Sequence, residues 1–76
     1  MSTQIVMDDS GDTRHEFKVG DREALVHAEA RFRELTARGY RAVALGDNAN
    51  RGQGRLLHKF DPSVEKTLFI PQLQGG

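Results

Sequence analysis

The sequence of 76 residues contains no cysteine, no tryptophan and only two prolines. Without cysteine the chain has no disulfide, no cysteine-ligated zinc and no catalytic thiol of its own. Its eleven basic and eleven acidic residues balance, so the net charge gives no reason to expect binding to nucleic acid or to an anionic membrane. Long apolar runs are absent, and residues 1–4 lack the pattern of a signal peptide. These absences predict a small soluble cytoplasmic domain.

The first part of the sequence predicts a β-hairpin. Residues 5–7 form a short apolar run, and residues 8–12 are a cluster of turn formers. Within residues 13–19, His15, Phe17 and Val19 alternate with charged residues, which is typical of a half-buried strand. We therefore expect two strands joined by a loop of about five residues.

Residues 21–38 have the pattern of one amphipathic helix. Asp21 can accept the free amide hydrogens of the first turn, and Gly39 suits the left-handed conformation that ends many helices. The apolar positions recur at steps of three and four, which gives one stripe. Its members are Leu25, Ala28, Phe32 and Leu35.

The remainder of the sequence predicts three more strands, at residues 40–45, 55–60 and 67–71, with a glycine- and asparagine-rich loop after the first of them. In residues 40–45 we expect Val43 and Leu45 to point into the core, and Ala42 and Ala44 to point outward. One helix packed across a mixed sheet of four to five strands is an α+β arrangement. The order of elements favours a β-grasp fold over residues 1–71, with the last strand parallel to the first.

Catalytic and metal-binding patterns are weak in this sequence. The three histidines, His15, His27 and His58, do not have the spacing of metal ligands. The glycine-rich residues 46–54 lack the Lys-Ser/Thr pair of a phosphate-binding loop. No nucleophile and base are placed in a recognisable order, so we expect neither an enzyme nor a bound metal.

The most informative segment is the last five residues, Gln72-Leu73-Gln74-Gly75-Gly76. Two glycines without side chains can enter a narrow channel and present an unhindered carboxylate. With its order of elements and its length, the chain resembles ubiquitin-like proteins, in which a leucine three residues from the end precedes two glycines. It departs from eukaryotic ubiquitin at Gln72 and Gln74, where ubiquitin has arginines. More specifically, it resembles bacterial ubiquitin-like modifiers encoded beside their own conjugation enzymes.

This resemblance implies a protein modifier that is not itself an enzyme. Gly75 and Gly76 would form the site of activation, and Gln72, Leu73 and Gln74 would be recognised as a tail. A partner activating enzyme would consume ATP to adenylate Gly76, so the chain would need no cofactor of its own. The other expected partners are a conjugating enzyme, a target protein and a deconjugating protease. The resemblance also implies a role in defence against phage and a monomer in the free state.

A docking patch is expected close to this tail. If Phe69 faces the core, the alternation of a strand places Leu68 and Ile70 outside, beside Ala42 and Ala44 on a neighbouring strand. A contiguous apolar patch of this kind would be a surface for a partner protein.

Two other functions are compatible with the same sequence. A sulfur carrier shares the fold and the diglycine but carries a C-terminal thiocarboxylate, and adenylation is common to both routes. A non-covalent interaction domain would have the two glycines by coincidence.

Overall fold

The computed structural model describes residues 1–45 and 54–71, which form a β-grasp domain with one helix packed across a five-stranded mixed sheet. This confirms the predicted fold class. The elements in chain order are β1 (Ser2–Asp8), β2 (Gly11–Phe17), α1 (Arg22–Ala37), β3 (Tyr40–Leu45), β4 (Gly54–Leu57) and β5 (Lys66–Pro71).

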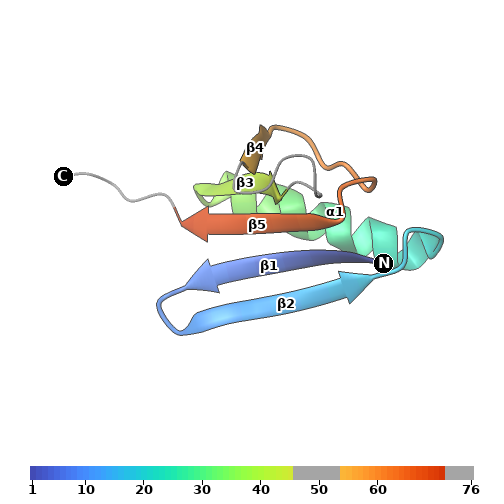
Figure 1. The fold of residues 1–76 in the computed structure, drawn as a ribbon, viewed down its shortest axis with the longest axis horizontal. Coiled ribbons are helices and arrows are strands. Elements are labelled where there is room, and N and C mark those ends of the chain that lie inside the picture. The colour runs from blue at the N-terminus through green and yellow to red at the C-terminus, as the bar shows by residue number, and fades with distance from the viewer. Residues whose placement is uncertain (46–53, 72–76) are drawn as a thin grey trace.

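The strands are ordered β2-β1-β5-β3-β4 across the sheet (Figure 1). β5 is therefore central, parallel to β1 on one side and antiparallel to β3 on the other. β1 with β2, and β3 with β4, form the antiparallel pairs. Helix α1 packs against one face of this sheet, here called the inner face, and the opposite face is called the outer face.

The first hairpin is tighter than expected, because β1 and β2 pair continuously from Ser2↔Phe17 to Asp8↔Gly11. Only Asp9 and Ser10 lie between the two strands. The Asp8 carboxylate accepts hydrogen bonds from the amide and hydroxyl of Ser10, at 2.9 and 2.7 Å. Gly11 then adopts a φ of 122°, which favours glycine.

The second strand is consequently shifted relative to the sequence prediction. His15 and Phe17 share the inner face as expected, whereas Val19 lies beyond the end of β2 and is 44% exposed. The expected strand over residues 13–19 is therefore too long at its end, because β2 ends at Phe17 and the chain turns toward α1.

The predicted helix is confirmed. The Asp21 side chain accepts a hydrogen bond from the Ala24 amide at 3.2 Å and caps the first turn. At the other end, Arg38 is the C-cap residue and Gly39 has a φ of 100°. The helix buries Ala28, Phe32 and Leu35 against the sheet.

Phe69 on β5 is the centre of the core and has no exposed surface. Its ring packs edge-on against Phe32 of α1, with the ring centroids 5.7 Å apart. Phe60 extends this cluster, because its ring lies 6.1 Å from Phe32 and 6.2 Å from Phe17. This contact explains why β4 ends at Leu57 and does not continue to Phe60 as predicted, since the chain leaves β3 to bring Phe60 toward the helix.

The facing of β3 is the reverse of the prediction. Ala42 and Ala44 are buried on the inner face, at 1% and 5% exposure, whereas Val43 and Leu45 lie on the outer face and are half-buried. The large Phe32 and Leu35 side chains fill the space between α1 and β3. The sheet positions beneath them therefore hold small residues.

A buried polar contact ties α1 to the first strand. Gln4 is only 1% exposed, and its amide nitrogen donates to the Ala28 carbonyl at 3.0 Å. Arg31 donates to the Gln4 side-chain oxygen at 2.8 Å. Both ends of the Gln4 amide are thus paired, which removes the cost of burying it. His15 is the cross-strand neighbour of Gln4, and burial followed by the Arg31 charge lowers the pKa of its imidazole.

Replacement of Phe32 tests this packing. Phe32→Ala removes the ring that joins Phe69 to Phe60, and we expect a loss of about 3–5 kcal/mol of unfolding free energy. A domain of this size has roughly 4–11 kcal/mol in total, so much of the protein would unfold. Urea denaturation followed by circular dichroism measures the loss, with the exposed Val26→Ala as the control. An unchanged midpoint for Phe32→Ala would contradict the assigned helix face.

A second prediction concerns pH. Because the folded state lowers the pKa of His15, folding disfavours its protonated form, so its stabilising contribution is complete above the ordinary histidine pKa of about 6.5 and is lost as pH falls toward the lowered value. The free energy of unfolding should decline as the pH falls below about 6.5, and less steeply in His15→Gln. Equal slopes for the two proteins would show that His15 is not the sensitive group.

Candidate functional site

The outer face carries a row of apolar side chains that crosses four strands. The register places Ile5 of β1 beside Leu68 of β5, Leu68 beside Val43 of β3, and Val43 beside Leu56 of β4. We call these four residues the outer strip. Side chains on directly opposed strand positions lie close enough to touch, so the row forms one continuous surface.

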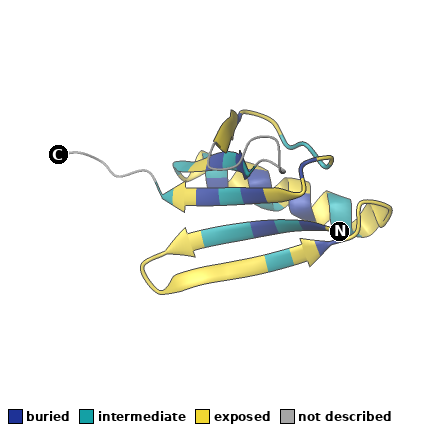
Figure 2. Cartoon of the chain, viewed as in Figure 1, coloured by how far each residue is buried: buried dark blue, intermediate teal, exposed yellow. Residues whose placement is uncertain are grey.

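The outer strip is accessible. Leu56 is 48% exposed, and the other three side chains are half-buried. Figure 2 shows that α1 leaves this side of the sheet uncovered over the described residues. Gly54 contributes to the flat surface, because a Cβ atom at this position would overlap the Cγ1 atom of Val43. Contiguous exposed apolar surface is a feature that many binding sites share, so the outer strip is the candidate site of this domain.

Ile70 lies beside the outer strip, two residues after Leu68 on the same face of β5. It is 41% exposed, which agrees with the prediction that it points outward. Its cross-strand neighbour on β3 is Arg41. At the other end of β5, Lys66 is the neighbour of Leu45. Cations therefore lie at both ends of the β5 segment that contributes to the apolar surface.

The predicted patch is only partly correct. Leu68 and Ile70 lie on the outer face as expected, but Ala42 and Ala44 are buried beneath α1 and cannot contact a partner. Val43 and Leu56 occupy the corresponding outer positions. The prediction missed Ile5 and Leu56 because adjacent apolar pairs, Ile5-Val6 and Leu56-Leu57, do not reveal which member faces inward.

The expected site of activation, Gly75 and Gly76, lies outside the described residues. So do the three residues that are expected to be recognised as a tail, Gln72, Leu73 and Gln74. What the structure does describe is the strand leading toward them, since β5 ends at Pro71, directly before this segment.

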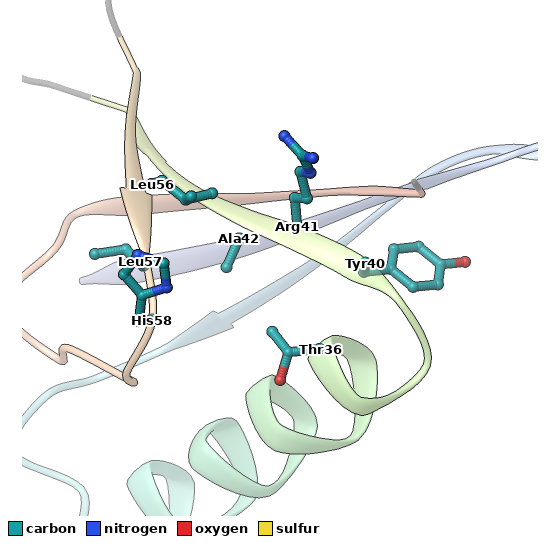
Figure 3. Close-up of a pocket in the computed structure, with 7 residues that line it drawn as sticks. All are labelled: Thr36, Tyr40, Arg41, Ala42, Leu56, Leu57 and His58. Atoms are coloured by element: carbon teal, nitrogen blue, oxygen red, sulfur yellow. The ribbon is translucent and has the colours of Figure 1, made fainter. Parts of the chain in front are cut away.

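A hollow of about 210 Å³ lies between the end of α1, the start of β3 and the end of β4. Figure 3 shows Arg41 and Ala42 pointing to opposite sides of β3 at this place. The Thr36 hydroxyl donates its hydrogen bond to the helix backbone, with its oxygen 2.9 Å from the Phe32 carbonyl oxygen and 3.2 Å from that of Arg33. His58 also lines the hollow. These groups do not form a nucleophile and base pair.

Among residues 1–45 and 54–71, no cluster of three or more His, Cys, Asp or Glu side chains could hold a metal ion. Within the same part of the chain, α1 is too short and too polar to cross a bilayer.

No family model, curated protein or solved structure matches the chain.

Adjacent substitutions on β5 test the assigned facing. Ile70→Asp should change the unfolding free energy by about 1 kcal/mol or less, because the carboxylate remains in water. Phe69→Asp should unfold the domain, because it would bury a charge without a partner. Thermal unfolding of the two variants measures the contrast. Similar losses at both positions would contradict the alternation described for β5.

Proposed function

We propose that this chain is a ubiquitin-like protein modifier that is joined to a target protein through the Gly76 carboxylate. The outer strip would dock the domain on a partner activating enzyme, and the segment after β5 would enter the enzyme's active site. Defence against phage, which the sequence resemblance implies, stays a prediction.

The observation that supports this proposal most is the arrangement of β5. One face of this strand inserts Phe69 into the core, and the other contributes Leu68 to the outer strip and presents Ile70 beside it. The chain passes from this strand into residues 72–76, and the diglycine begins four residues after Pro71. An enzyme that binds the outer face would therefore hold the strand that directly precedes the tail. Docking would place the start of the tail close to the bound enzyme.

The chemistry requires only an electrophile from this chain. A carboxylate oxygen of Gly76 attacks the α-phosphate of ATP, which forms an acyl-adenylate and releases pyrophosphate. A partner thiolate then attacks the acyl carbon, forming a thioester and releasing AMP. An amine or hydroxyl of the target finally displaces the thiol. The chain contains no cysteine, so the thiolate must come from a partner.

The partner surface should be apolar at its centre and acidic beside Arg41 and Lys66. The outer strip would supply the buried core of the interface, which is normally depleted in charge. The two exposed cations flank that core along β3 and β5. Complementary charges at these positions would increase the association rate and fix the orientation more than they would raise the affinity.

The test uses the chain with an N-terminal tag, expressed in the cells that encode it. Trypsin cleaves after Lys66, and no lysine or arginine follows, so a conjugated target peptide would carry the branch Thr67–Gly76. Mass spectrometry of tagged material should find this branch on a lysine or a hydroxyl side chain. Gly76→Ala should reduce conjugation sharply, because a methyl group next to the carboxylate crowds a channel shaped for glycine. Ile70→Asp should also reduce it.

Val26→Asp is the matched control, because Val26 is a β-branched residue on α1 with 60% exposure and lies away from the outer face. It should conjugate like the unmodified chain. Equal loss in Val26→Asp and Ile70→Asp would contradict docking through the outer face. Recovery of the chain with a C-terminal thiocarboxylate, in which sulfur replaces one oxygen, would identify it as a sulfur carrier. The absence of any covalent change at Gly76 would leave a non-covalent interaction domain.

A further inference from the structure

The outer edge of β2 is an open strand edge. β2 pairs with β1 at all seven of its positions, and no other element in the described part of the chain pairs with it. In an antiparallel pair, alternate residues direct their amide and carbonyl groups away from the partner strand. The far side of β2 therefore presents unpaired backbone groups, and Figure 2 shows most of this strand as exposed.

Several devices that block such an edge are missing from β2. The segment contains no proline, and its one-to-one register with β1 leaves no bulge. Its outer-face side chains are Asp12, Arg14 and Glu16, which are charged but alternate in sign. A row of one sign would repel every neighbouring copy, whereas a row of alternating sign discriminates between registers.

We propose that two copies of this chain associate through their β2 strands, antiparallel about His15, to form one continuous sheet. In this register Arg14 of each copy lies opposite Glu16 of the other, which gives two symmetric pairs of opposite charge. On the inner face, Thr13 lies opposite Phe17. Opposite charges on facing positions of antiparallel strands stabilise the pair.

Neighbouring registers are disfavoured by the same side chains. Moving the centre to Arg14 would place Asp12 opposite Glu16, and moving it to Glu16 would place the two Glu16 side chains opposite each other; both shifts oppose like charges. A centre at Thr13 would instead pair Arg14 with Asp12. Glu16→Arg separates that register from the one about His15, because only the register about His15 places Glu16 opposite Arg14. Sliding one β2 strand by a single residue along the other would place an inner-face side chain of one copy opposite an outer-face side chain of the other.

The contact is small because it adds one strand to one strand, and such interfaces are weak. The pairing departs from the monomer expected from the sequence.

Because the two-fold axis is perpendicular to the sheet, the two outer strips would face the same side. A dimer would therefore present two outer strips to a partner that has two binding sites, which raises the effective affinity of the dimer for that partner. This inference does not depend on the proposed conjugation.

The test is sedimentation equilibrium of the full chain over a range of concentrations, with reversal of charge on β2. The unmodified chain should dimerise as its concentration rises. Arg14→Glu and Glu16→Arg should each remain monomeric, because each opposes like charges at two symmetric positions. An equimolar mixture of these two variants should recover dimers, since every facing pair then has opposite signs. The double variant R14E/E16R should also dimerise.

Arg33→Glu is the control, because it makes the same change of charge on the exposed face of α1 and should not alter dimerisation. Circular dichroism establishes that each variant is folded. A chain that stays monomeric at all concentrations would overturn the proposal. So would a dimer that survives Arg14→Glu, or a mixture of the two single variants that fails to associate, since either result assigns the contact to another surface or register.

Discussion

The burial of Phe69 is the constraint on which the rest of the structure depends. β5 lies in the middle of the sheet, and this side chain is fully enclosed beneath α1. Because side chains alternate along a strand, enclosing Phe69 places Leu68 and Ile70 on the outer face. The pairing of β5 with β1 and β3 then brings Ile5 and Val43 to either side of Leu68. The burial of this one side chain thus determines which residues of β5 lie in the core and which contribute to the outer strip.

The register that produces this arrangement is also fixed by polar contacts. A shift of β1 by one residue would move Gln4 to the outer face and leave the Ala28 carbonyl and Arg31 without this partner. Nonpolar packing alone discriminates poorly between two adjacent apolar residues such as Ile5 and Val6. The paired amide of Gln4 therefore adds specificity to the association of helix and sheet.

The sequence predicted the elements and the facing of α1 and β5, but it reversed the facing of β3. The helix followed from its apolar spacing, from Asp21 and from Gly39, which all act locally. The facing of β3 did not follow, because Ala42 and Ala44 are buried only as a consequence of the large helix residues above them. Larger side chains at Val43 and Leu45 suggested that these residues face the core, but the space there is already filled by large side chains of the helix. Of the proposed patch, Leu68 and Ile70 could be placed because Phe69 is an unambiguous core residue.

The facing of β3 and β5 is best tested in solution by the relaxation of methyl groups in the presence of an inert, water-soluble gadolinium chelate. The account predicts strong enhancement for the methyl groups of Leu56 and Ile70, and protection for those of Ala42 and Ala44. Protected Leu56 and Ile70 methyl groups with strongly relaxed Ala42 and Ala44 would contradict it. In that case the apolar outer strip would not exist, and docking beside the tail would lose its structural basis.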